Sequence, residues 1–226
     1  WGEALQGTFI PTIEFKADYF AGLIAVLGTT ISPYLFFWQA SQEVEEIDRA
    51  PTEQALAEAP YQAPMEIVRI KADTYIGMGI SNLIAFFIIL TSAVTLHAHG
   101  KTDIQSATQA AEALRPVAGD FAFALFTVGI IGTGLLAVPV LAGSAAYAVS
   151  GVFGWSASLE RQALQAKRFY GVLAAATLIG LGLNFTSIDP IKALFWAAVI
   201  NGVLAGPVMV VIMLMATNPA VMSQFI

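Results

Sequence analysis

The feature that most limits what this chain can fold into is an uncharged run that is interrupted near its own middle. The run extends from Tyr19 to Gln42, between Asp18 and Glu43, and about 20 apolar residues are enough for a helix to cross a bilayer. The interruption consists of small, hydroxyl-bearing or helix-breaking residues, which are Gly28, Thr29, Thr30, Ser32 and Pro33. Proline lacks a backbone N–H and clashes with the preceding turn, so carbonyls near Thr29 lose their helical donors. Such a carbonyl is costly in hydrocarbon unless it faces protein, water or an ion, so an interrupted membrane helix points to a substrate site.

Composition indicates a membrane protein. Of the 226 residues, 57% are hydrophobic and 12% are charged, whereas soluble domains carry about 25% charge. The chain has no cysteine, which excludes disulfides and cysteine-based metal sites within it. Its formal net charge of −6 and the lack of a basic stripe argue against binding to nucleic acid. The sequence begins at Trp1 without a signal-peptide pattern, and we interpret it as a piece of a longer protein.

Uncharged stretches predict five membrane spans within a single transmembrane domain that covers residues 1–226. The predicted spans are 19–41, 74–96, 121–149, 169–184 and 193–216. The connections on one side of the membrane hold six basic residues and those on the other side hold four, so the richer side, with the loop 42–72, is predicted to be cytoplasmic. This loop is acidic at its start. We interpret it as a solvated connector or, alternatively, as a vestibule that attracts cations.

The polar residues of the first span are the main candidates for a binding site. No Asp, Glu, Lys or Arg lies at the centre of any predicted span, although such residues normally mark ion pathways. The available ligands are hydroxyls, amides and backbone carbonyls, so a hard cation bound here needs carboxylates from elsewhere in the full protein. The candidates are Thr29, Thr30, Ser32, Tyr34 and Gln39. The alternative is that the hydroxyls bond back to carbonyls one turn earlier and only bend the helix.

Two asparagines provide further polar groups inside the spans. Asn82 lies on the second span and Asn201 on the fifth. Each is interpreted either as a substrate contact or as a hydrogen-bonding residue between helices. His97 and His99 stand at the end of the second span without a third ligand, which favours an interfacial role over a metal site. A haem- or quinone-binding bundle needs His pairs inside its spans, and the predicted spans contain none.

The residues of the interruption resemble those of a known family. The segment Gly28-Thr29-Thr30-Ile31-Ser32-Pro33-Tyr34 is similar to the Gly-Ala-Thr-Val-Met-Pro-His-type break in the sixth helix of the natural resistance-associated macrophage protein (Nramp) family. Gly28, Thr30 and Pro33 match. The order of the later spans resembles helices six to ten, with Asn201 near the polar residues of the tenth helix. The resemblance extends over most of the chain.

The resemblance implies a proton-coupled transporter of divalent metal ions such as Mn²⁺, Fe²⁺ or Mg²⁺, with an inverted-repeat (LeuT-type) fold and two broken helices. It also implies that a carbonyl at Thr29 and the side chain at the position of Ser32 complete the metal site, with an Asp-Pro-Gly-Asn motif upstream of Trp1. Ser32 replaces the family's Met, which removes a bias against hard ions such as Mg²⁺. Tyr34 replaces a His of the proton route, and a phenol does not ordinarily titrate near neutral pH.

We therefore predict an all-α membrane protein that is a secondary transporter of divalent metal cations and not an enzyme. The predicted metal ligands are Thr29, Ser32 and Asn201, and the break and pathway residues are Gly28, Thr30, Pro33, Tyr34 and Asn82. No cofactor is expected besides the transported ion. The expected partners are the lipid bilayer, the remainder of the chain and, as an open alternative, protons, and the expected location is a bacterial inner (plasma) membrane. The alternative functions are a broken-helix transporter of amino acids or other organic solutes, and a structural or electron-transfer membrane subunit.

Overall fold

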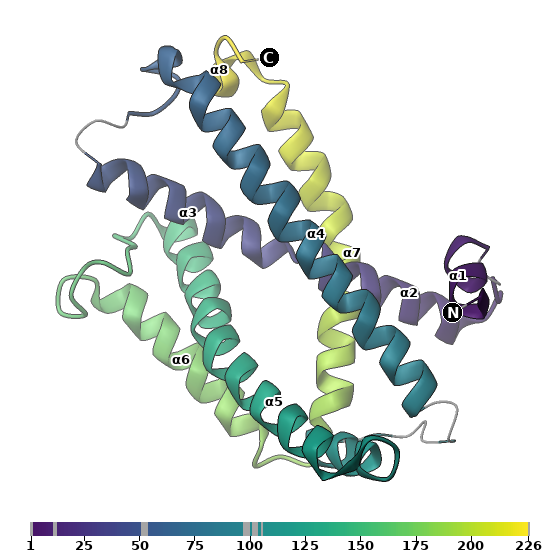
Figure 1. Ribbon diagram of the computed structural model, residues 1–226. Coiled ribbons are helices and arrows are strands. Elements are labelled where there is room, and N and C mark those ends of the chain that lie inside the picture. Colours follow the sequence, from purple (N-terminus) through teal and green to yellow (C-terminus); the bar gives the residue numbers. More distant parts are fainter. Residues whose placement is uncertain are drawn as a thin grey trace.

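The protein is all-helical in a computed structural model that describes residues 2–10, 13–50, 54–96, 100, 104 and 106–225. Its helices are α1 (Gly2–Phe9), α2 (Ala17–Thr30), α3 (Pro33–Arg49), the short 3₁₀ helix η1 (Pro60–Gln62), α4 (Ala63–Thr95), α5 (Ala107–Phe153), α6 (Lys167–Leu183), α7 (Pro190–Ala216) and α8 (Pro219–Met222) (Figure 1). The described residues contain no strand, which confirms the predicted all-α class. His97 and His99 lie outside the described residues.

Four helical segments of the described chain are long and apolar enough to cross a membrane. They are Ala17–Arg49, Pro60–Thr95, Gly119–Phe153 and Pro190–Ala216. The third begins where Gly119, at φ 77° and ψ 179°, divides α5. The predicted span 169–184 corresponds to α6, which has 17 residues and is therefore about 25 Å long. That is less than the hydrocarbon thickness of about 30 Å, so the crossing of α6 stays a prediction.

Helices continue beyond the uncharged runs, so much of the predicted loop 42–72 is helical. α3 extends through the acidic residues after Gln42 to Arg49, and α4 begins at Ala63. Charged residues end an apolar surface, but Glu and Arg are good helix formers and do not end a helix. The charge pattern therefore locates the apolar part of each helix more closely than it locates the helix ends.

Local sequence chemistry fixes several helix ends. Gly154 adopts φ 63°, a left-handed conformation that costs glycine little, and it ends α5. The N–H of Trp155 then donates to the carbonyl of Ser150 at 2.9 Å. At the start of α7, the carboxylate of Asp189 accepts from the N–H of Ile191 at 2.9 Å, as an N-cap residue does.

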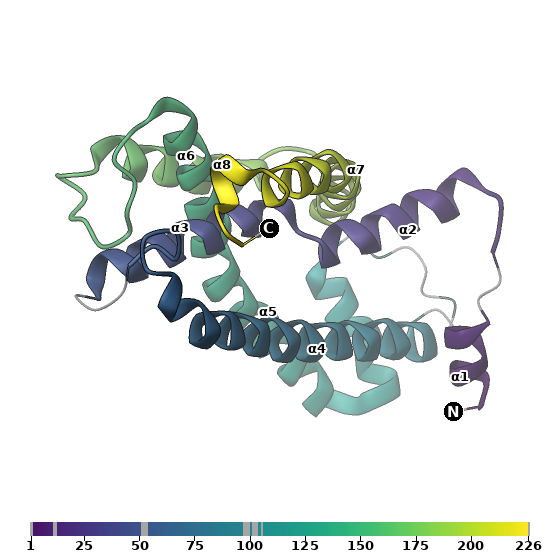
Figure 2. The same ribbon diagram turned by 90° about the horizontal axis from the view of Figure 1, so that it is seen from above.

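The helices pack mainly in two groups. α2 lies against α7, whereas α3 lies against α5 and α5 lies against α6, and a smaller contact between α3 and α7 joins the groups. The buried core of the second group consists of Ala146, Tyr147, Ala166 and Phe169. α4 overlaps α2 in Figure 1 but is separate from it in Figure 2, and η1 is its one closely packed partner among the described elements. Large apolar side chains such as Ile88 remain exposed along α4, as expected for a surface that lipid or another helix covers.

Candidate functional site

The first helical run divides into two half-helices at the residues that the sequence indicates. α2 ends at Thr30 and α3 begins at Pro33. Between them, Ile31 (φ −101°, ψ 60°) and Ser32 (φ −69°, ψ 100°) are not helical. Pro33 occupies the first position of α3, where a helix has no use for the missing N–H. Figure 1 shows α2 followed by α3 along one line, so the break lies within a run long enough to span a membrane.

Hydroxyl groups at the break bond to carbonyls of the same segment. The Oγ1 atoms of Thr29 and Thr30 both donate to the carbonyl of Val26, at 2.8 and 2.9 Å, so these two side chains follow the back-bonding alternative. Ser32 differs, because its Oγ donates to the carbonyl of Thr29 at 3.0 Å, inside the break. Ser32 is also buried, whereas both threonines are exposed. The Ser32 hydroxyl and the Thr29 carbonyl therefore form a pair of neighbouring oxygens at the break.

The break also leaves a carbonyl without its helical donor. The N–H of Ile31 still donates to Leu27 at 2.8 Å, and the N–H of Leu35 donates to the carbonyl of Ser32 at 3.0 Å. The carbonyl of Thr29 has no helical donor, because the residue four positions later is Pro33, which has no N–H. A carbonyl without its helical donor can accept from a side chain, as this one does from Ser32, or from water, or contact a cation.

Two glycines bring the α2 half of the break against α7. A Cβ atom on Gly28 would lie 2.5 Å from the nitrogen of Gly202 and would overlap the carbonyl of Ala198, and a Cβ atom on Gly202 would overlap the carbonyl of Ile24. Backbone atoms cannot turn aside as a flexible side chain can, so this approach requires glycine at both positions. The contact places the peptide between Asn201 and Gly202 beside Gly28. Asn201 is half-buried, and the described residues provide no hydrogen-bond partner for its amide.

The other site residues predicted from the sequence lie apart from this contact. Tyr34 is half-buried in the first turn of α3, and Gln39 is exposed further along that helix. Asn82 is exposed on α4, which Figure 2 shows away from α2 and α7. The structure therefore brings the backbone next to Asn201, but not Asn82, against the last turn of α2. Sequence reasoning treats the two asparagines alike, because only the packing of distant helices separates them.

Two of the acidic residues that follow the first apolar run are paired with one arginine. Arg69 contacts Glu66 at 2.8 Å, Glu43 at 3.2 Å and Glu46 at 3.6 Å. The pairs with Glu43 and Glu46 join the end of α3 to α4, and the pair with Glu66 lies within α4. Each is partly exposed and contributes about 0–1 kcal/mol. The pairing supports a structural connector here rather than a vestibule of free carboxylates.

The groups that the break could offer a metal ion are few. Among the described residues, no three His, Asp or Glu side chains lie together in a way that could hold a metal. The oxygen ligands that could reach a metal ion near the break are backbone carbonyls and the Ser32 hydroxyl, and α7 offers the amide of Asn201. Hard divalent cations accept oxygen ligands of these kinds but usually require one or two carboxylates as well.

Comparison with known proteins identifies a family for this arrangement. No curated protein matches the chain. A family model described as "Natural resistance-associated macrophage protein-like" matches residues 1–226. Members of that family are membrane transporters of divalent metal ions rather than enzymes, and they have the LeuT-type fold. Because the match covers the whole sequence, and because the long apolar helices are those of an integral membrane protein, the chain belongs to the Nramp family.

Proposed function

We propose that this chain forms one side of the substrate site of a secondary transporter for divalent metal cations, with the ion held at the break between α2 and α3. The observation that carries the proposal is the pair of oxygens formed by the Thr29 carbonyl and the Ser32 hydroxyl, 3.0 Å apart. Adjacent ligands of an octahedral ion with bonds of about 2.0–2.1 Å are themselves about 3 Å apart. The pair therefore has the spacing to share one ion, provided that the hydroxyl proton turns away and leaves a lone pair in its place.

The remaining ligands are proposed to come from α7 and from outside this chain. The Asn201 amide is a candidate because the peptide that follows it lies beside Gly28. Carboxylates are expected from the part of the full protein that precedes Trp1, since the described residues provide no acidic cluster for an ion.

The chemistry of Ser32 supports a broad choice of metal. A hydroxyl oxygen suits Mg²⁺, Mn²⁺ and Fe²⁺, whereas a thioether favours softer ions and disfavours Mg²⁺. We propose that Mg²⁺ is therefore a substrate together with Mn²⁺ or Fe²⁺. The proposed location is the inner membrane of a bacterium with residues 42–72 in the cytoplasm, because that side carries more Lys and Arg.

The test is a change of ligand at position 32 in the full-length protein. Ser32→Met should raise the preference for Cd²⁺ or Mn²⁺ over Mg²⁺ by roughly tenfold, in binding by calorimetry and in proteoliposome uptake. Thr30→Ser is the matched control, because it keeps both a hydroxyl and the backbone carbonyl, and it should leave the order of preference unchanged. An unchanged order in a folded Ser32→Met protein would contradict a ligand role for Ser32.

A further inference from the structure

The end of α3 that lies away from the break is joined to α5 by a partly buried polar contact. The carboxylate of Glu45 accepts from the hydroxyl of Tyr147 at 2.6 Å and from the N–H of Leu159 at 3.3 Å. The amide of Gln42 donates to the Tyr147 oxygen at 3.3 Å. Because Leu159 belongs to the segment between α5 and α6, Glu45 connects α3 to α5 and to that segment at once. Hydrogen bonds to a charged acceptor are stronger than neutral ones.

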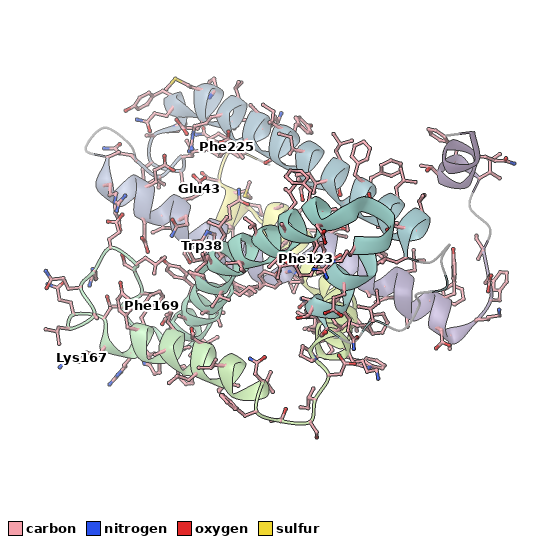
Figure 3. All side chains as sticks on the ribbon, turned by 60° about the horizontal axis from the view of Figure 1, so that its bottom comes forward. Trp38, Glu43, Phe123, Lys167, Phe169 and Phe225 are labelled. Carbon is pink, nitrogen blue, oxygen red and sulfur yellow. The ribbon has the colours of Figure 1, made fainter. Side chains whose placement is uncertain are left out.

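Aromatic packing surrounds the same hydroxyl. The ring of Tyr147 lies edge-on to Trp38 of α3, with centroids 5.9 Å apart, and 4.9 Å from the ring of Phe169 of α6. Gly143 of α5 leaves room for the Trp38 ring, since a Cβ atom there would lie 2.5 Å from a ring carbon. Figure 3 shows Trp38 and Phe169 on the facing sides of these helices. Tyr147 is 4% exposed, so its side chain is the central contact of three helices.

A second contact lies nearer the surface on the same side. Arg49, the last residue of α3, forms an ion pair with Glu160 in the segment between α5 and α6. The Arg49 side chain is largely exposed, so this ion pair is the weaker of the two connections between α3 and the α5–α6 segment.

We name the three residues of the first connection, Glu45, Tyr147 and Leu159, the α3 clamp.

The other half-helix has different partners. α2 packs on α7 through Gly28 and Gly202, and the described residues show no comparable contact of α2 with α5 or α6. α3 has a smaller contact with α7 as well, but its main contacts are with α5, and the non-helical pair Ile31 and Ser32 separates the two half-helices. A short non-helical segment between two well-packed bodies can absorb a change in their relative orientation, as a hinge does.

We propose that Glu45 and Tyr147 are positioning residues, which hold α3 against α5 and α6 as one rigid body on one side of the bend at Ile31–Ser32. The inference rests on the proposed function in one respect, since it takes Ser32 to be a metal ligand. With the clamp intact, α3 holds Ser32 in one position, where it can bind the metal ion. When the clamp is weakened, only a fraction of the molecules have Ser32 in that position, and the apparent affinity for metal falls in proportion to that fraction.

The proposal is tested by distances between spin labels in the full-length protein in lipid nanodiscs. The 226 residues contain no cysteine, so label sites can be introduced once any cysteine elsewhere in the full chain has been replaced. Val44 and Lys167 are exposed positions that report on α3 relative to α6, and Leu23 and Leu125 report on α2 relative to α5. The diamagnetic ions Mg²⁺ and Cd²⁺ serve as substrates.

The expected result is one narrow distance between Val44 and Lys167 that does not change when metal is added, while the distance between Leu23 and Leu125 shifts. Tyr147→Phe keeps the ring but removes the hydroxyl, and it should broaden the first distance even without metal and lower Cd²⁺ affinity about tenfold. Tyr170→Phe is the matched control. The hydroxyl of Tyr170 donates to the carbonyl of Leu159 at 3.0 Å and has no hydrogen bond to a described residue of α3, so this variant should keep the narrow distance.

Two outcomes would overturn the proposal. One is a distance between Val44 and Lys167 that shifts with metal in the native protein. The other is a distance in Tyr147→Phe that is as narrow as in the native protein. Both outcomes are distances between spin labels, measured with or without metal, and neither depends on which metal is preferred. They are therefore distinguishable from a failure of Ser32 as a ligand.

Discussion

Tyr34 lies half-buried in the first turn of α3, where the resemblance to the family implies a histidine. A phenol in water releases its proton near pH 10 and an imidazole does so near pH 6.5, so only the imidazole changes charge around neutral pH. Proton relays in membranes normally consist of Asp, Glu or His. We therefore expect no proton path through residue 34. In proteoliposomes with an internal pH-sensitive dye, the native protein and Tyr34→Phe should give the same proton signal during Mn²⁺ uptake.

The complementary change at the same residue should create pH dependence. Tyr34→His should give uptake a dependence on pH with a midpoint near pH 6.5, because the imidazole becomes charged below it. Tyr34→Phe is the control for loss of the phenol alone. If proton influx accompanies metal in the native protein and disappears in Tyr34→Phe, Tyr34 belongs to a relay and the expectation is wrong.

The contact between α2 and α7 depends on the absence of side chains at Gly28 and Gly202. In Gly202→Ala the added methyl group would meet the backbone carbonyl of Ile24, which cannot move without the helix. We expect this variant to lose about 1–3 kcal/mol of stability and to show reduced uptake, because α7 and Asn201 are displaced from the break. The measurement is thermal unfolding in detergent together with proteoliposome uptake.

Gly206, also in α7, provides a matched control for the Gly202→Ala variant. Nothing lies within 4 Å of a Cβ atom at Gly206, and alanine is a better helix former than glycine by about 1 kcal/mol. Gly206→Ala should therefore leave stability unchanged or slightly raise it, with normal uptake. Equal behaviour of the Gly202 and Gly206 variants would show that close approach of α2 and α7 is not needed.

At the scale of the whole molecule, the connection from α3 to α4 and the connection from α5 to α6 lie at the same end of the helices. The ion pair between Arg49 and Glu160 brings the end of α3 to the segment between α5 and α6. Figure 1 shows both segments on one side of the structure, with the connection from α6 to α7 at the opposite end. The alternation of loops inferred from the charge pattern requires this arrangement. The excess of Lys and Arg predicts that the shared end faces the cytoplasm.

Single cysteines in intact cells test this topology. Tyr61 and Leu164 are each 77% exposed, one before α4 and one between α5 and α6, and Ile188 is 50% exposed before α7. A membrane-impermeant thiol reagent should label Ile188→Cys directly, but should label Tyr61→Cys and Leu164→Cys only after permeabilisation. Labelling of Tyr61→Cys and Leu164→Cys from opposite sides would contradict the alternation. Labelling of both from outside would reverse the orientation only.

The sequence by itself determined the features that depend on local chemistry. An apolar, weakly charged composition specifies membrane helices, since backbone groups in hydrocarbon must bond within their own segment. Pro33 removes a donor at a known place, and the helix ends at Thr30 and resumes at Pro33 accordingly. Asp189 and Gly154 end or begin helices for equally local reasons. The sequence did not show whether the acidic residues after Gln42 continue α3 or form a loop, because charged side chains indicate contact with solvent and do not indicate that a helix has ended.

Only the tertiary structure decided which distant residues meet. The peptide that follows Asn201 lies against Gly28 in the last turn of α2, and Asn82 lies on a helix away from it, although both are single amides within apolar runs. Glu45 accepts from Tyr147, and no spacing in the sequence relates the two, since they belong to different helices. Gly202 is needed where a carbonyl of α2 presses on it, whereas Gly206 one turn later is not. The physical reason is common to all three cases: backbone chemistry acts over a few residues, while packing depends on how whole helices cross.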